Sequence, residues 1–179
     1  MNRVMARVIF YTTLYWEAVC CCLQPWRHWW DEVDEGVILG AMPSRKNLAQ
    51  LQAMEVRAII NMCEEHECSV ARCTPYGMDA IQLPTRDRCP PSLQDIVRAM
   101  DFIAEYRKRG DGVYIHCRAG RGRGATVALC WLIKSQQVTP SQAFTMLAKR
   151  RRQVDAALDQ REAVQQFWRD CGQAEEVAS

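Results

Sequence analysis

The sequence of 179 residues has little lysine, almost no net charge and no internal repeat or low-complexity linker. Its basic residues are overwhelmingly arginine, and the formal net charge at pH 7 is +2. A near-neutral chain gives no reason to expect nucleic-acid binding, whereas arginine in place of lysine favours phosphate recognition. The G-K-[ST] sequence of a phosphate-binding ATPase loop is also missing. From this composition we expect one globular domain that binds an anionic ligand.

Long apolar runs are missing as well. Between Val8 and Leu23 the only charged residue is Glu17, but this run is shorter than the roughly 20 apolar residues that a membrane-spanning helix needs. We therefore expect residues 1–30 to form a targeting or membrane-associated arm that lies on a membrane surface, followed by a domain of residues 31–179.

The composition of this arm suggests how it is used. It contains Arg3 and Arg7 and has no acidic residue before position 17, which is compatible with mitochondrial import. Trp26, Trp29 and Trp30 follow, and their mixture with cationic residues is typical of a membrane interface. A clamp that holds the arm onto the domain explains the tryptophans equally well.

The ten cysteines have no regular spacing. A disulfide framework in a secreted protein usually shows one, so we interpret these cysteines as thiols in a reducing compartment. Cys63, Cys68 and Cys73 lie near His66, but this spacing is not a usual zinc-ligand pattern. We expect no metal and no other cofactor.

One glycine-rich segment combines a cysteine with three arginines. Residues 113–133 read VYIHCRAGRGRGATVALCWLI, which predicts a strand, a turn and a buried helix. Cys117 and Arg123 stand in a C-x5-R arrangement. A loop of this length can turn its backbone N–H groups inward, next to the partial positive charge of the helix N-terminus. The predicted lining of this phosphate site is Arg118, Ala119, Gly120, Arg121 and Gly122.

Cys117 is the predicted nucleophile. A thiol ionises more easily at a helix N-terminus beside cationic groups, and the planar fork of Arg123 can bind two phosphate oxygens and follow them into the transition state. We expect His116 to hydrogen-bond within the loop and to support the thiolate. A buried structural cysteine is the alternative, but it would not require three arginines and three glycines in one loop.

Asp87 is the predicted general acid and base. Cleavage of a phosphate ester needs a proton for the leaving oxygen, and Asp87 lies on the loop after a predicted strand at residues 81–83. Asp79 precedes that strand and Asp95 belongs to a helix start, so both are expected away from the site. In the predicted reaction Cys117 attacks phosphorus while Asp87 protonates the leaving group, and Asp87 then activates water against the phosphocysteine. An ordinary solvated aspartate remains the alternative.

Alternating strands and helices predict an α/β fold: a single domain with a mainly parallel central sheet and helices on both faces. The predicted strands are residues 37–40, 56–62, 81–83 and 113–116. Ser44, Ser92 and Thr139 are expected to begin helices as N-caps. Residues 149–152, which are all basic, are interpreted as the solvated end of a helix that complements its dipole, with a patch for lipid headgroups as the alternative.

The motif HCRAGRGR, followed by an apolar helix, resembles the signature of the dual-specificity branch of the cysteine-dependent protein tyrosine phosphatase superfamily. The stretches ARVIFYTTLYW, VILGAMPSR and INMCEEHE are similar to those of the mitochondrial phosphatidylglycerophosphate phosphatases. The resemblance implies an enzyme at the mitochondrial inner membrane that converts an anionic phospholipid, phosphatidylglycerophosphate, to phosphatidylglycerol in the cardiolipin pathway. It also implies that Glu64 and Glu65, in the acidic loop, shape the substrate site.

The sequence departs from this family at several positions. Arg118 stands where lysine is common, and glycines replace serines at positions 122 and 124. A hydroxyl at position 124 stabilises the leaving thiolate in the family, so Gly124 bears on turnover, and Thr126 is a candidate replacement. Two other functions stay open. One is a cytoplasmic dual-specificity phosphatase for phosphoprotein or phosphoinositide, and the other is a catalytically weak phosphate-binding module.

Overall fold

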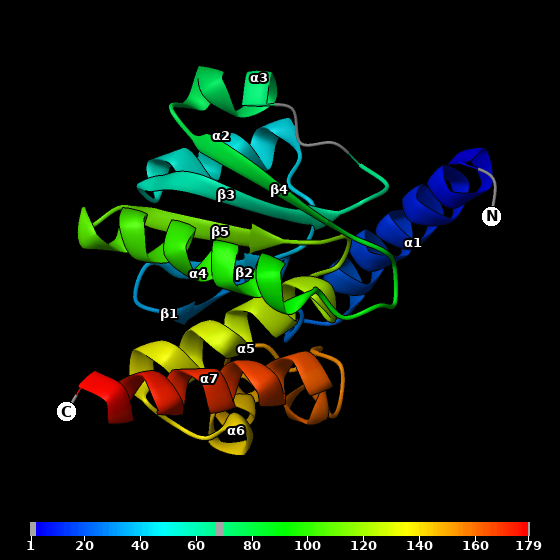
Figure 1. Cartoon of the computed structure of the whole chain (residues 1–179). Coiled ribbons are helices and arrows are strands. Elements are labelled where there is room, and N and C mark those ends of the chain that lie inside the picture. Colours follow the sequence, from blue (N-terminus) through cyan, green and yellow to red (C-terminus); the bar gives the residue numbers. More distant parts are fainter. Residues whose placement is uncertain (1–2, 67–69, 179) are drawn as a thin grey trace.

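The structure is a computed structural model that describes residues 3–66 and 70–178. Figure 1 shows a central sheet with helices on both of its faces and helix α1 extending to one side. The strands are β1 (Trp30–Asp34), β2 (Val37–Gly40), β3 (Val56–Cys63), β4 (Asp79–Thr85) and β5 (Gly112–His116). The helices are α1 (Arg3–Leu23), α2 (Arg45–Ala53), α3 (Val70–Cys73), η1 (Thr74–Tyr76), α4 (Leu93–Lys108), α5 (Arg123–Gln136), α6 (Pro140–Arg150), η2 (Leu158–Gln160) and α7 (Glu162–Ala178).

The sheet has five strands in the order β1-β2-β5-β3-β4. Strand β1 pairs antiparallel with β2, and all other pairs are parallel. The predicted mainly parallel sheet is therefore confirmed. Strand β1 was not predicted, because its sequence WDEVD buries only Val33 and lacks the apolar run of a central strand.

Strand β4 is longer than expected and begins at Asp79 instead of after it. This corrects the placement of Asp79 before the strand. The carboxylate of Asp79 still lies at the amino end of the sheet, where it accepts a hydrogen bond from the hydroxyl of Tyr106 (2.5 Å).

Two layers of buried side chains cover the two faces of the sheet. Val113 and Ile115 of β5 pack into the larger core with α4, α5, α6 and α7, whereas Tyr114 between them packs into the smaller core with α2. This alternation follows from the period of two in a β-strand. The helices therefore cover both faces of the sheet, as predicted, and bury β5 between them. The loop that contains Cys117 begins at the carboxyl end of β5.

The predicted helix starts are confirmed. The side-chain oxygens of Ser44, Ser92 and Thr139 each accept a hydrogen bond from the backbone N–H three residues later. Ser44 and Thr139 also form complete capping boxes. Each cap satisfies backbone donors that the first helical turn leaves unpaired.

The prediction for residues 149–152 is wrong at Arg151. Lys149, Arg150 and Arg152 are exposed, but Arg151 is completely buried. Helix α6 ends at Arg150, and Arg151 turns into an extended conformation (φ −130°, ψ 94°). Its side chain therefore leaves the solvated helix surface and enters the interior.

The arm consists of α1 and a short connection to β1. Trp29 donates a hydrogen bond from Nε1 to the carbonyl oxygen of Met42 (3.2 Å), and the ring of Trp30 lies edge-on to Tyr114. These two tryptophans fasten the connection to the domain, whereas Trp26 remains 46% exposed. Of the two roles considered for the tryptophans, Trp29 and Trp30 perform the clamp.

No helix in residues 3–66 and 70–178 is both long and apolar enough to cross a bilayer.

Candidate active site

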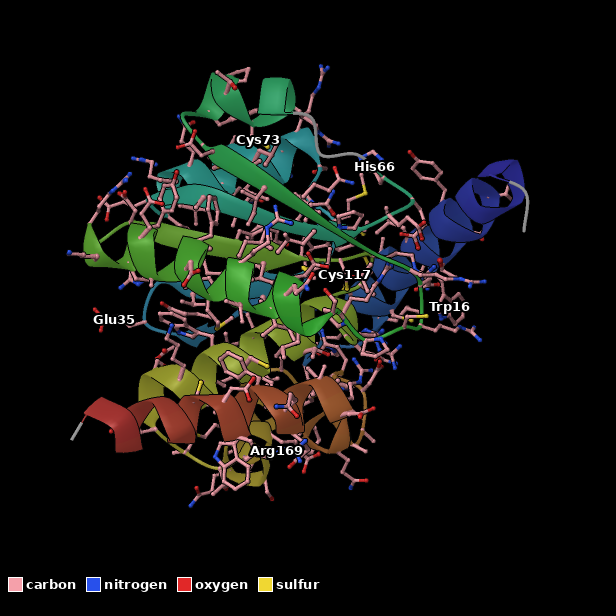
Figure 2. All side chains as sticks on the ribbon, in the orientation of Figure 1. Trp16, Glu35, His66, Cys73, Cys117 and Arg169 are labelled. Atoms are coloured by element: carbon pink, nitrogen blue, oxygen red, sulfur yellow. The ribbon has the colours of Figure 1, made fainter. Side chains whose placement is uncertain are left out.

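The loop between β5 and α5, together with the first residue of α5, forms a phosphate cup (residues 117–123). Figure 2 shows Cys117 where β5 ends, at the carboxyl edge of the sheet. Gly120 has a φ of +63°, and a Cβ atom there would lie 2.5 Å from the carbonyl oxygen of Gly40. Only glycine fits this turn, because L side chains rarely adopt a positive φ and the space is already filled.

The cup is held in shape from outside. The carbonyl oxygens of residues 117–122 all lie within hydrogen-bond distance of a donor that belongs to the surrounding structure. The donors are His116 Nδ1 for residue 117, the N–H of Met42 for 118, the Arg151 guanidinium for 119 and 120, the N–H of Asp155 for 121, and Thr126 for 122. Because N–H and C=O point in opposite directions across a trans peptide, this arrangement turns N–H groups toward the interior of the cup.

The sulfur of Cys117 lies among these inward N–H groups. Burial by itself raises the pKa of the thiol, but the positive charge of Arg123 and hydrogen bonds from the N–H groups of Gly124, Gly120 and Arg121 outweigh it. The net effect lowers the pKa of Cys117 below its ordinary value. The thiolate is the nucleophilic form of cysteine, so the structure provides the activation that the sequence predicts.

Arg123 is 4% exposed, and its guanidinium faces three acceptors. Nη1 donates to Glu65 Oε2 (2.7 Å) and to the carbonyl oxygen of Thr85 (2.9 Å), and Nη2 lies 3.2 Å from Asp87 Oδ1. A guanidinium has five N–H donors, so these contacts leave the Nε donor and one Nη2 donor. These two donors remain for the oxygens of a phosphate.

Asp87 lies on the loop after β4 and bridges two arginines of the cup. Its second carboxylate oxygen, Oδ2, is 2.9 Å from Arg118 Nη1. The loop therefore brings the predicted acid next to Arg118 and Arg123 of the cup. Its role as proton donor stays a prediction.

Comparison with known proteins agrees with this geometry. Residues 37–169 match the catalytic domain of dual specificity phosphatases. The chain belongs to the dual-specificity phosphatase family. It is a cysteine-dependent phosphatase, and its fold is the one that the sequence predicts.

Among its relatives, the phosphatidylglycerophosphate phosphatase PTPMT2 of Arabidopsis thaliana is 37% identical over 91% of this chain and 73% of its own. The phosphatidylglycerophosphatase and protein-tyrosine phosphatase 1 of Rattus norvegicus is 32% identical over 93% of this chain and 91% of its own. The crystal structure of PTPMT1 in complex with PI(5)P superimposes with a TM-score of 0.77 at 26% identity, covering 83% of this chain and 99% of that one.

The two acidic residues expected beside the phosphatase site have different positions. Glu65 is mostly buried and pairs with Arg123, whereas Glu64 is exposed and none of the described hydrogen bonds or ion pairs joins it to the cup. Asn61 fixes this turn, because its side chain accepts from the N–H of Cys63 (2.9 Å) and donates to the carbonyl oxygen of His66 (2.7 Å). The structure therefore brings only Glu65 to the catalytic arginine.

The side chains of Arg118 and Arg121 also have different positions. Arg118 turns toward Asp87, whereas Arg121 is half exposed and donates from Nε to the carbonyl oxygen of Gln153 (2.9 Å) on the outside of the cup. The backbone N–H of Gly120 bonds to the Cys117 sulfur, whereas Ala119 and Gly122 are held through their carbonyl oxygens by Arg151 and Thr126.

Thr126 does not replace the hydroxyl that is missing at Gly124. Its hydroxyl donates to the carbonyl oxygen of Gly122 (2.9 Å) and accepts from Arg161 Nη1 (2.5 Å), so its proton is not available to Cys117. A Cβ atom at position 124 would lie 3.3 Å from Leu39 Cδ1 and 3.5 Å from the backbone nitrogen of Cys117. A small side chain there requires only a slight shift of Leu39.

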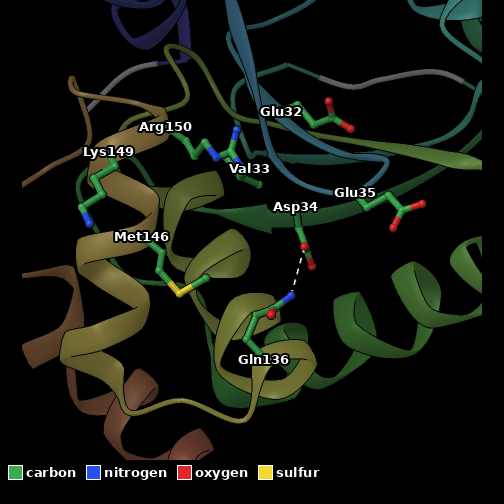
Figure 3. A pocket seen from close by; sticks show the side chains of 8 residues that line it. All are labelled: Glu32, Val33, Asp34, Glu35, Gln136, Met146, Lys149 and Arg150. Carbon is green, nitrogen blue, oxygen red and sulfur yellow. Dashed lines mark hydrogen bonds between the residues drawn. The ribbon is translucent and has the colours of Figure 1, made fainter.

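A separate cavity lies away from this chemistry. It has a volume of about 600 Å³ between the β1–β2 turn and helices α5 and α6, and Figure 3 shows its lining of mixed charge. Asp34 is its central acid, but the carboxylate already accepts hydrogen bonds from Trp131 (2.7 Å), Ser135 (2.9 Å) and Gln136 (3.1 Å). Because Asp34 pairs with Val37 at the amino end of β2, the cavity is at the end of the sheet opposite the cup.

Proposed function

We propose that this phosphatase hydrolyses the phosphomonoester of phosphatidylglycerophosphate to give phosphatidylglycerol. The observation that carries the proposal is a preformed anion cup with an activated thiolate in a chain that matches enzymes named for this reaction along nine-tenths of its length. Arg118 and Arg123 suit an anionic headgroup, because guanidinium groups bind phosphate oxygens in pairs.

The geometry supports a two-step reaction. The phosphate binds to the inward N–H groups and to the two remaining donors of Arg123, with phosphorus in front of the Cys117 sulfur. The thiolate attacks phosphorus in line, the bond to the ester oxygen breaks, and Asp87 gives that oxygen its proton. Asp87 then removes a proton from water, which attacks the phosphocysteine and releases inorganic phosphate and the thiolate.

Helix α1 supports a location at a membrane. Its outward face carries large apolar side chains that are each between 52% and 75% exposed: Val8, Tyr11, Tyr15, Trp16 and Leu23. Leu14 instead packs against the domain core. Aromatic and aliphatic side chains on one face of a helix are typical of a segment that lies in the headgroup region of a bilayer.

The helix and the cup share one side of the molecule. The parallel strands point toward the side on which α1 extends, and Cys117 and Trp16 both lie toward that side in Figure 2. A bilayer that receives α1 would therefore be near the edge of the sheet that carries the cup. With the arginine-containing start of the arm, this favours the mitochondrial inner membrane and the cardiolipin pathway as the setting.

Phosphate release from three substrates tests the proposal. The full chain is mixed with phosphatidylglycerophosphate, PI(5)P or a phosphotyrosine peptide in vesicles of matched composition, and Cys117→Ser serves as the inactive control. We expect release to be fastest from phosphatidylglycerophosphate. Release from the peptide alone would overturn the lipid assignment. Binding of phosphate without release from any substrate would identify a phosphate-binding module.

A further inference from the structure

Arg151 is the largest of the completely buried side chains in the described part of the chain. A guanidinium removed from water is unfavourable unless its donors are paired. Its partners lie on two separate parts of the molecule. These partners indicate the role of the Arg151 guanidinium.

On one side Arg151 holds two successive peptide units of the cup. Nε donates to the carbonyl oxygen of Gly120 and Nη2 to that of Ala119, both at 2.9 Å. The same two peptide units carry the N–H groups of Arg121 and Gly120. Since these N–H groups point opposite to the held carbonyls, Arg151 turns inward two of the donors that bind the Cys117 sulfur.

On the other side Arg151 holds the segment that joins α1 to β1. Nη1 donates to Asp31 Oδ2 (2.6 Å) and to the carbonyl oxygen of His28 (3.3 Å). The side chain of Gln153 donates to the same carbonyl oxygen (3.2 Å), and the His28 ring lies 2.8 Å from the other oxygen of Asp31. We call residues 28–31 the arm root.

We propose that Arg151 is a positioning residue that couples the arm root to the N–H groups that bind phosphate. A single rigid fork joins the two parts, so a displacement of the arm root moves the peptide units of residues 119–121. Binding of the arm to a membrane then changes the affinity of the cup for phosphate. The proposal rests on the phosphatase chemistry of the cup and holds for any lipid headgroup.

The experiment uses the full chain without lipid and four variants. Arg151→Met removes the fork, Arg151→Lys keeps the charge without the fork, and Asp31→Asn removes the charge only on the side of the arm root. Arg150→Met is the matched control, because Arg150 is exposed at the end of the same helix. Three properties are measured: competitive inhibition by inorganic phosphate, turnover of a soluble aryl phosphate, and the pH dependence of Cys117 alkylation by iodoacetate.

We expect Arg151→Met to weaken phosphate inhibition by about 100-fold, the effect of a small misplacement of binding groups, and to move the alkylation midpoint to higher pH. Arg151→Lys should lie in between, and Asp31→Asn should weaken phosphate inhibition by about 10-fold, since it leaves a hydrogen bond without its charge. Arg150→Met should change none of the three properties.

Thermal unfolding of each variant separates this role from general destabilisation. If Arg151→Met does not fold, Arg151→Lys and Asp31→Asn decide by the same measurements. A folded Arg151 variant with wild-type phosphate inhibition and alkylation midpoint would overturn the positioning role. Wild-type behaviour of Asp31→Asn would overturn the coupling to the arm root. Neither result depends on which lipid is the substrate, so the proposed function is tested independently.

Discussion

At the scale of single residues, the phosphatase site depends on buried charged groups that stabilise one another. The sulfur of Cys117 is buried, which by itself raises its pKa, but Arg123 and three backbone N–H groups stabilise the thiolate and lower the pKa. Arg123 is in turn kept in place by Glu65 and Asp87. Arg123 therefore lies between two negative charges, the Cys117 thiolate and the Glu65 carboxylate, so each of the three charges has a neighbour of opposite sign.

The lowered pKa of Cys117 predicts the pH dependence of its alkylation. The thiolate persists as pH falls until the pH passes the lowered pKa, so inactivation by iodoacetate should have its midpoint below the usual thiol pKa of about 8.5. Arg123→Met removes the main stabilising charge and should move the midpoint upward, whereas Arg150→Met should leave it in place. A wild-type midpoint at or above the usual value would contradict the thiolate.

Asp87→Asn tests the general acid. Asparagine keeps a hydrogen-bonding oxygen beside Arg118 and Arg123 but has no proton to transfer, so kcat/KM for an alkyl phosphate should fall by about 10²–10⁴-fold. An aryl phosphate with a good leaving group should lose far less. The control is Asp95→Asn at the start of α4, which should leave both rates unchanged. Equal losses for the two substrates would mean that another group supplies the proton.

At the scale of elements, the cup is held between β5 and α5. The buried strand fixes one end of the loop and the buried helix fixes the other. Between them, Gly120 is closely surrounded by the Gly40 carbonyl and the Arg151 guanidinium. The shape of the cup therefore depends on how β5, α5 and the residues around Gly120 pack together.

Gly120→Ala compared with Gly77→Ala separates conformational strain from crowding. Both glycines have a positive φ, but a Cβ atom at Gly77 meets no atom within 4 Å. Gly77→Ala should lower the free energy of unfolding only by the cost of the left-handed conformation, about 1–2 kcal/mol, and should keep normal activity. Gly120→Ala should cost more in the free energy of unfolding, measured with urea, and should lower kcat/KM by about 100-fold. Similar behaviour of the two variants would mean that the packing around Gly120 yields easily.

At the scale of the whole molecule, the arm and the domain join at the arm root. Helix α1 packs Leu14 against the core and buries Cys20, and it directs Val8, Tyr11, Tyr15, Trp16 and Leu23 outward. A face of this kind gains free energy when it leaves water, about 1.5–3 kcal/mol for each large side chain.

Charge introduced into this face should weaken binding to vesicles. We expect Tyr15→Glu or Trp16→Glu to lower co-sedimentation with anionic vesicles by roughly 10-fold or more, from the burial that is lost, without affecting turnover of a soluble aryl phosphate. Val97→Glu, an exposed apolar position on α4, is the control and should bind as the wild type does. Unchanged sedimentation of the α1 variants would contradict membrane binding through α1.

Local signals in the sequence predicted much of this architecture. The caps at Ser44, Ser92 and Thr139 and the order of strand, loop and helix around Cys117 each depend on residues within a few positions of one another. Arg151 could not be recognised in this way, because its partners Gly120 and Asp31 lie 31 and 120 positions away. Strand β1 was missed for a similar reason, since only its pairing with β2 makes it a strand.

The outward anchoring of the cup carbonyls has a consequence for selectivity. A receptor whose shape is fixed before the ligand arrives loses little entropy on binding, so it recognises a tetrahedral dianion with or without an ester group attached. Inorganic phosphate, the product, then competes with every substrate at the same donors. We therefore expect discrimination among phosphate esters to come from the surroundings of the cup, such as Arg118 and the loop of Asp87.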